Sequence, residues 1–200
     1  MNRDTLKERQ RQLREDLILD TAHELLLEQG YAEMSMDDLA SRVGVSKATL
    51  YQHFPSKEEL AVRVIVRSMG QGERYIASQD PQLPALQRLE QIMRHAIERR
   101  ADLRTAKIRI SPLCIKQHPL YIAQYNRMVL ALTSLVEEAK TAGDIRADLP
   151  TQIVVRTLLS LVRDADYEDL VLSGETTLGE LSGLLAQIFF KGIQPRTLSA

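Results

Sequence analysis

Two short amphipathic segments separated by a glycine turn are the feature that most restricts how this chain of 200 residues can fold. The first segment begins at Ser35, and its apolar residues recur at the i, i+3, i+4, i+7 spacing of one helix face. Gly44 ends it, because glycine readily adopts the left-handed conformation that closes a helix. Ser46 supplies the N-cap of a second segment that runs to about His53. The pattern predicts two short helices joined by a tight turn.

A longer helix is expected before this pair and another after it. The apolar residues of the preceding segment fall on one helical face: Leu17, Ile18, Ala22, Leu25 and Leu26. Gly30 is a suitable C-cap for it, and Ser56 with Glu59 forms a capping box for the following helix. This order is typical of a helix-turn-helix, whose second helix enters the DNA major groove. A tight helical hairpin inside a core has the same turn, so the exposed face must distinguish the two.

The outward face of the second short helix carries no carboxylate. At about 100° per residue, Leu50 and Phe54 point toward the core. The rest of the surface consists of Lys47, Ala48, Thr49, Tyr51, Gln52 and His53. Such a slim surface, rich in hydrogen-bond donors, suits DNA base edges and phosphates better than bulk water. Lys47, and Lys57 after Ser56, place cations at helix N-termini where the dipole disfavours them, so a DNA phosphate is the expected partner.

The stretch from Ile18 to Ile65 resembles the DNA-binding domain of the TetR family of bacterial repressors. It carries a G-[YF]-x-x-x-[ST]-[MV]-x-x-[IL]-A entry, then G-V-S-x-x-[TL]-[LIV]-Y-x-[HY]-F, then [ST/N]-K-x-x-L, and it covers about a quarter of the chain. The resemblance implies phosphate contacts for Tyr51, His53 and Lys57. It also implies that the caps Ser35 and Ser46 approach phosphate, that Lys47, Ala48 and Thr49 face the groove, and that the role of Gln52 varies.

The chain as a whole is predicted to be all-α, with about nine helices. Leu, Ala, Glu, Arg and Gln recur throughout, and no strongly alternating strand pattern occurs. We expect a helix-turn-helix domain over 12–72, with its motif at 35–54, and a helical effector-binding and dimerisation domain over 73–200. Gly70 and Gly72 interrupt the helix between them, either as a frayed helix end or as a hinge.

The resemblance also implies partners. Members of the family pair through their two last long helices, here about 151–172 and 177–191, and bind a palindromic operator in double-stranded DNA. It implies a ligand-responsive repressor with a small-molecule effector. The alternative is a small-molecule binding protein whose helix-turn-helix is degenerate.

The charge pattern suggests where an effector binds. Residues 88–109 have seven Lys or Arg against three acids, whereas residues 163–180 have one Arg against six acids. These are either solvated or mutually paired faces, or part of a pocket for an anionic effector. The candidate effector-binding residues are Arg94, His95, Arg99, Cys114, His118, Tyr121, Tyr125 and Met128.

Other classes of function find little support. Cys114 and His118 are four residues apart without further metal ligands nearby, and no P-loop or catalytic triad stands out. No metal, cofactor or enzymatic activity is therefore predicted. The net charge of −1 does not favour nucleic acid, although residues 1–14 carry five cations against two acids, as a solvated arm can. The N-terminus lacks a signal-peptide core, and the apolar run from Met128 to Val136 is too short for a membrane span, which predicts a cytoplasmic protein.

Overall fold

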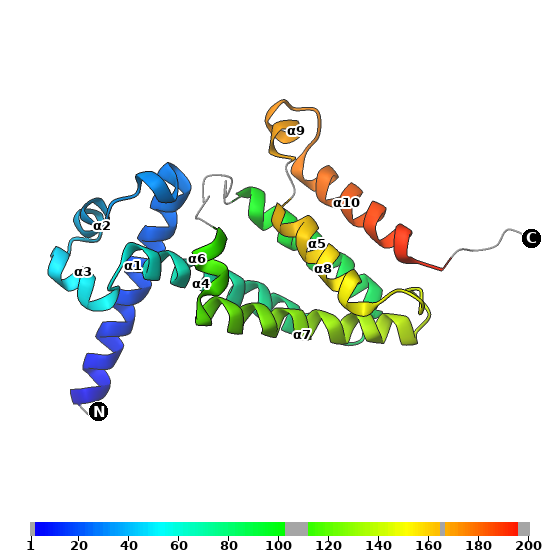
Figure 1. Cartoon of the computed structure of the whole chain (residues 1–200), viewed down its shortest axis with the longest axis horizontal. Helices are drawn as coiled ribbons and strands as arrows, with labels where there is room; N and C mark the ends of the chain where they lie inside the picture. Colours follow the sequence, from blue (N-terminus) through cyan, green and yellow to red (C-terminus); the bar gives the residue numbers. More distant parts are fainter. Residues whose placement is uncertain (1–2, 103–111, 165–166, 196–200) are drawn as a thin grey trace, which may run out of the picture. The chain divides into compact units, whose positions relative to one another are not determined.

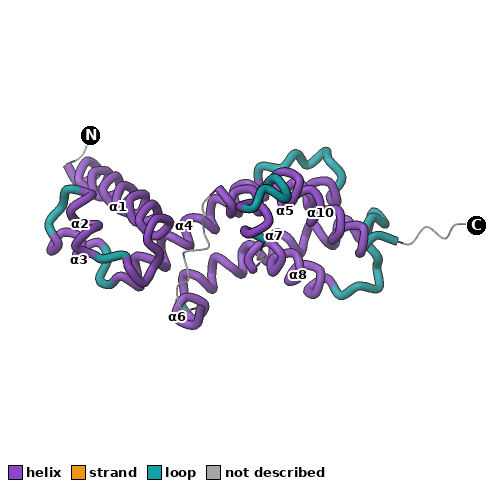
Figure 2. Tube along the Cα trace, turned by 90° about the horizontal axis from the view of Figure 1, so that it is seen from above, coloured by secondary structure: helices purple, strands orange, loops and turns teal. Residues whose placement is uncertain are grey.

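The computed structural model describes residues 3–102, 112–164 and 167–195, and every regular element in these ranges is a helix. Figure 1 labels the ten helices: α1 (Arg3–Glu33), α2 (Met36–Val43), α3 (Lys47–His53), α4 (Lys57–Ala77), α5 (Ala85–Asp102), α6 (Pro112–Gln117), α7 (Pro119–Thr141), α8 (Thr151–Asp164), α9 (Glu168–Leu172) and α10 (Leu178–Ile193). The predicted all-α class is confirmed, and Figure 2 draws only helices and loops along the described trace.

The described residues divide into two compact units. The first unit comprises residues 3–69 and 112–124, so it contains α1 to α3, most of α4, α6 and the start of α7. The second comprises residues 70–102, 125–164 and 167–195, so it contains the end of α4, α5, most of α7, and α8 to α10. The functional domains over 12–72 and 73–200 stay predictions.

The predicted caps hold the helix-turn-helix in the first unit. Ser35 Oγ accepts a hydrogen bond from the Asp38 backbone N–H at 3.0 Å, which satisfies one of the unpaired donors at the start of α2. Gly44 ends α2 in the left-handed conformation, with φ of 75°. Gly30 also has a positive φ, 81°, and bends the chain within α1. These turns let α1, α2, α3 and α4 enclose one core, which consists of Ile18, Ala22, Leu25, Leu26, Met34, Met36, Leu39, Ala40, Leu50, Phe54, Leu60 and Val64.

Two sequence interpretations are wrong: the interruption of a helix at Gly70 and Gly72, and a single long helix over 151–172. A hinge at the two glycines stays a prediction. Helix α4 continues through Gly70 and Gly72 without interruption, and neither glycine has a positive φ. A glycine in a helix costs about 1 kcal/mol, which two packed flanks can outweigh. The segment 151–172, expected to be one long helix, contains α8 and α9. The ten described helices agree with the expectation of about nine. The arm over residues 1–14 is helical from Arg3, although every side chain from residue 5 to 14 is exposed.

The second unit packs α5 against α10, with α7 and α8 completing the core. Leu89 and Met93 of α5 and Phe190 of α10 are almost completely buried there. One polar contact crosses this packing: Ser182 of α10 is fully buried, and its hydroxyl donates to the Glu98 carboxylate of α5 at 2.8 Å. A second polar contact joins the buried Arg88 of α5 to Glu138 of α7.

Candidate nucleic-acid interface

Helix α3 presents one face to the core and the other to solvent. Leu50 and Phe54 are buried to 0% and 1% exposure, as the helical spacing predicted. Ala48, Tyr51 and Gln52 are exposed on the other side. The described structure gives no hydrogen bond that occupies the Gln52 amide, so its donor and acceptor are available to a ligand. The outward face of α3 therefore offers a methyl group, a phenol and an amide.

The N-terminus of α3 is closed by its own side chains. Ser46 Oγ accepts from the Thr49 backbone N–H at 3.1 Å, and the two hydroxyl oxygens lie 2.8 Å apart. Thr49 is half-buried. The Thr49 hydroxyl, predicted to face the groove, is thus engaged with the cap, which leaves Gln52 and Tyr51 as the more available polar groups of this helix.

Lys47 has an acidic partner that the sequence did not indicate. Its ammonium lies 2.7 Å from a carboxylate oxygen of Asp37, in the first turn of α2, and both side chains are largely exposed. The hydrogen bond to Asp37 raises the pKa of Lys47, and the charge of the same carboxylate adds to the effect. Asp37 compensates for the unfavourable cation at the start of α3. A phosphate that binds Lys47 has to replace this carboxylate.

His53 joins the end of α3 to α1. Its Nδ1 lies 3.1 Å from Glu15 Oε1, and the His53 side chain is only 10% exposed. The same carboxylate oxygen accepts a bond from Arg11 Nε at 3.3 Å. His53, predicted to contact phosphate, therefore has a carboxylate at one ring nitrogen, and Glu15 is a neighbour of the interface that reasoning from the sequence missed.

Lys57 is held by the end of α1. Its ammonium donates to the Ala32 carbonyl oxygen at 3.1 Å and lies 4.6 Å from the centre of the Tyr31 ring. A lysine ammonium has three N–H donors, so the bond to Ala32 leaves two that can reach a phosphate. The predicted phosphate contact of Lys57 remains a prediction, and the structure adds a second role for this lysine as a cap for α1.

Comparison with known proteins identifies the first unit. A sequence model described as "Bacterial regulatory proteins, tetR family" matches residues 18–64. The transcriptional activator FasR of Mycolicibacterium smegmatis is 48% identical over 50 residues, which cover 25% of this chain and 23% of FasR. Over residues 18–64 the chain is similar to the TetR family. It aligns with only about a quarter of the length of FasR and of the curated relatives of comparable similarity.

Solved structures extend this likeness to the fold of the whole chain. The fatty acid degradation regulator FadR of Bacillus halodurans has a TM-score of 0.76 at 20% identity, with 92% of this chain and 97% of FadR covered. FadR of Bacillus subtilis, solved in complex with stearoyl-CoA, has a TM-score of 0.72 at 21% identity, with 89% and 98% covered. At these identities the match concerns the fold alone.

The eight candidate effector residues are divided between the two units of the chain. His118 and Tyr121 belong to the first unit, and the side chain of Cys114 lies outside the described residues. His118 Nε2 lies 3.0 Å from Glu59 of α4, and Tyr121 packs beside Ala61, Val62 and Ile115. The remaining five residues belong to the second unit: Arg94, His95, Arg99, Tyr125 and Met128.

Three of these five side chains meet the same stretch of α4, residues 71–75. The His95 ring stacks on Tyr75 with 3.7 Å between ring centroids. Arg99 donates to the Gln71 side chain, and Met128 Cε lies 4.0 Å from where a Cβ on Gly72 would stand. Burial, followed by the charge of Arg99, lowers the pKa of His95, so the neutral imidazole is favoured. The second unit therefore has an aromatic and cationic cluster against α4.

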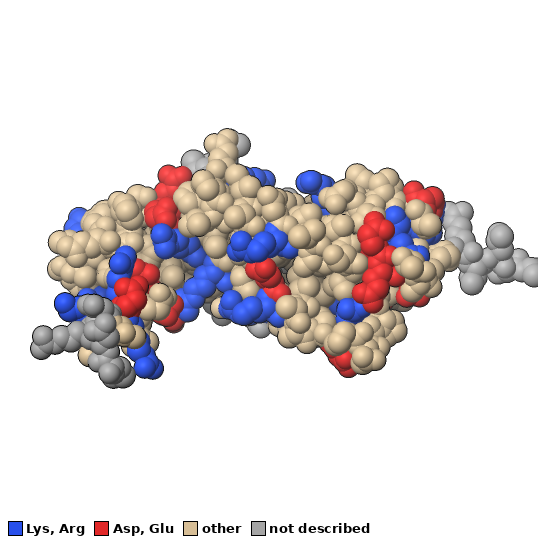
Figure 3. All heavy atoms as spheres, turned by 90° about the horizontal axis from the view of Figure 1, so that it is seen from below, with Lys and Arg blue, Asp and Glu red and all other residues tan. Residues whose placement is uncertain are grey.

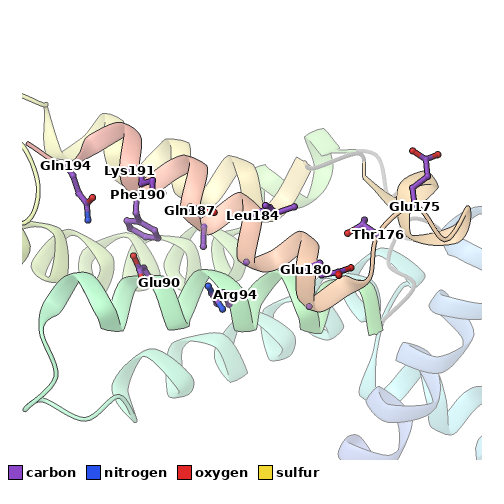
Figure 4. Close-up of a pocket in the computed structure, with 13 residues that line it drawn as sticks. Glu90, Arg94, Glu175, Thr176, Glu180, Leu184, Gln187, Phe190, Lys191 and Gln194 are labelled. Carbon is purple, nitrogen blue, oxygen red and sulfur yellow. The ribbon is translucent and has the colours of Figure 1, made fainter. Parts of the chain in front are cut away.

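Arg94 lies elsewhere on α5, in an open groove of about 750 Å³ between α5 and α10. Figure 4 shows its guanidinium below α10, with Glu90 on the same helix and Gln187 and Phe190 above. Gly183 of α10 lies over Arg94, since a Cβ there would stand 3.6 Å from the guanidinium. Arg94 is thus separate from the cluster on α4.

Metal sites, membrane-spanning helices and surface charge were also considered for the described residues. Within the described ranges, no three His, Cys, Asp or Glu side chains are grouped so as to hold a metal ion. No helix in those ranges is both long and apolar enough to cross a membrane. On the face shown in Figure 3, basic and acidic side chains are interspersed, so this face has no single continuous basic patch.

Proposed function

We propose that this chain is a DNA-binding transcriptional regulator that recognises a palindromic operator as a homodimer. The observation that supports this most is the outward face of α3, where Ala48, Tyr51 and Gln52 are exposed over a buried Leu50 and Phe54. A helix with a slim, carboxylate-free face can enter the major groove, and a glutamine can bond both N6 and N7 of adenine. The proposed role involves no catalysis. A bacterial transcriptional regulator acts on DNA in the cytoplasm, which is the proposed location of this protein.

The homodimer is proposed from the apolar surface of the last helices. Ile153 of α8 is 60% exposed, and Leu184 and Ile188 of α10 are 52% and 71% exposed, although both helices pack on α5. Large exposed apolar side chains on two helices of one unit are suited to pack against the same helices of a second copy. Two copies double the contacts that a helix as short as α3 can make to DNA.

Response to a small molecule is the third part of the proposal. The cluster of His95, Arg99 and Met128 on residues 71–75 of α4 is the first candidate site for an effector, because α4 belongs to both units. An effector changes operator affinity only if it binds the DNA-competent and DNA-incompetent states with different affinity. We propose repression that the effector relieves; because FasR is named an activator, a reporter gene must establish the sign.

A mobility-shift titration tests DNA binding. The full-length protein is titrated onto duplex DNA from upstream of its own gene, at 50 and 200 mM salt. We expect a discrete complex whose affinity falls steeply with salt, because phosphate contacts release counterions. Failure to bind any palindrome there, together with saturable binding of a small molecule, would favour the degenerate helix-turn-helix instead.

Two substitutions on α3 distinguish base reading from phosphate binding. Gln52→Ala should change the preferred bases in a selection from random duplexes, whereas Tyr51→Phe should weaken binding to all sequences alike, since it removes a phosphate-directed hydroxyl. A uniform loss for Gln52→Ala would contradict its base-reading role.

Ile188→Glu tests the homodimer. Light scattering should show a monomer at micromolar concentration, and an unchanged dimer would exclude the α10 interface.

A further inference from the structure

The N-terminal part of α1 is a helical arm with one basic face. Figure 1 shows this part of α1, in dark blue, continuing past α3 toward the N-terminus. All side chains from residue 5 to 14 are exposed, so no core packing explains their composition. Four cations, Lys7, Arg9, Arg11 and Arg14, stand there against the single acid Glu8.

Three of these cations share a face that is continuous with the core. At about 100° per residue, Lys7, Arg11 and Arg14 point within about 40° of the direction of Ile18. Ile18 is completely buried in the core that α1 forms with α2, α3 and α4. Beyond the end of that core, the same face of α1 therefore carries cations on the side of the helix where α2 and α3 lie.

The basic face begins where α3 ends. Glu15 Oε1 bonds both Arg11 of the arm and His53, the last residue of α3. Arg11 and His53 are thus neighbours through one shared carboxylate oxygen. Lys7 and Arg14 have no ion pair to another described side chain. From Arg14 back to Arg3 the helix rises about 17 Å, which is about five base pairs of duplex DNA.

We infer that the basic face of the arm, Lys7, Arg11 and Arg14, binds the phosphate backbone of DNA flanking each half-site. This inference rests on the proposed function and extends the interface from α3 along α1. Lysine and arginine on an exposed helix match regularly spaced phosphates and carry no sequence information. The arm therefore supplies affinity and register while α3 reads bases. Leu6 and Leu13 are exposed on a neighbouring face of the arm. The alternative to DNA binding is therefore that the arm packs against a second copy of the chain.

Fragment length provides the test. A palindrome is selected from random duplexes by the wild-type protein and prepared in two forms, one ending at the palindrome and one with about eight extra base pairs on each side. The wild type should bind the longer form more tightly at 50 mM salt. The triple variant Lys7→Gln/Arg11→Gln/Arg14→Gln should bind both forms alike and lose about 0.9 from the slope of log affinity against log salt for each phosphate contact removed.

A matched pair of single variants tests the face itself. Arg14→Gln and Arg9→Gln each remove one cation from the exposed arm, but Arg9 points about 140° away from Arg14 around the helix. Only Arg14→Gln should reduce the gain from flanking DNA, and equal losses would overturn the assignment of the face. Circular dichroism checks that helix content is retained.

Each failure has a distinct cause. If the wild type binds both fragments with equal affinity, the inference about the arm fails while the proposed function stands. If the wild type selects no duplex at all, both fail together. If the triple variant changes the association state in light scattering while it keeps its gain from flanking DNA, the arm is a contact between copies and the inference is wrong.

Discussion

Replacing Asp37 with asparagine should strengthen DNA binding. In the free protein the Lys47 ammonium lies 2.7 Å from Asp37, so Lys47 exchanges a carboxylate for a phosphate when DNA binds. The carboxylate left behind repels the phosphate and retains a cation of its own, which offsets the counterion that Lys47 releases. Asparagine keeps the size and polarity of the side chain but removes the charge, so that Lys47 is free to neutralise a phosphate.

The salt dependence sets the size of this effect. One additional neutralised phosphate steepens the slope of log affinity against log salt by at most about 0.9 per subunit. Between 200 and 50 mM salt, the advantage of Asp37→Asn over the wild type should therefore grow by roughly threefold per subunit and roughly tenfold for a dimer. Fluorescence anisotropy with a labelled operator at four or five salt concentrations measures both affinity and slope.

Asp20→Asn is the matched control. It makes the same change in net charge within the same unit, but Asp20 pairs with Arg67 of α4 at 2.9 Å and forms no hydrogen bond or ion pair with α3 in the described structure. If Asp20→Asn and Asp37→Asn strengthen binding equally, net charge alone accounts for the gain. If Asp37→Asn leaves affinity and slope unchanged, Lys47 does not exchange its partner for phosphate, and the reasoning is refuted.

Three further predictions concern stability. Ser46→Ala removes the acceptor of the Thr49 N–H and should lower the free energy of unfolding by about 1 kcal/mol in thermal melts, whereas Ser46→Asp should retain the cap. Phe190→Ala should cost about 3–5 kcal/mol in urea unfolding, because the ring is 1% exposed in the core of the second unit; a smaller loss would mean that the core collapses around the gap. The pKa of Glu59 is lowered, first by the hydrogen bond from Arg63 and then by the contact with His118. The contribution of Glu59 to the free energy of unfolding is therefore present above its ordinary pKa of about 4.5 and is lost as the pH falls through the lowered value. Glu59→Gln should therefore be less stable than the wild type at neutral pH and show a flatter loss of stability in acid, and parallel pH curves would contradict the assignment.

The sequence was most informative where one residue type has one local role. Ser35, Ser46 and Gly44 occupy the caps expected of them, because the bonds they make span three or four residues and depend on little else. The buried pair Leu50 and Phe54 followed from helical spacing in the same way. Such features are local, so their geometry is contained in the spacing of the residues.

Partners distant in the chain were not predictable in this way. Glu59 was expected to close a capping box with Ser56, but its carboxylate bonds Arg63 and His118, which is 59 residues away. Asp37 and Lys47 are ten residues apart and meet only because the turn at Gly44 folds α3 back toward the start of α2. Ion pairs of long side chains depend on tertiary placement, which spacing alone does not define.

The hydrogen bond from the buried Ser182 to the half-buried Glu98 favours one register of α10 on α5. A slide of α10 by about one turn in either direction would bring Leu178 or Gly179, or Leu185 or Ala186, opposite Glu98, and none of these side chains has a hydroxyl. The half-buried carboxylate would then lose this donor, at a cost of up to about 1–3 kcal/mol. The contact therefore gives α10 a preferred position on α5. Any signal that displaces one of these helices should therefore carry the other with it.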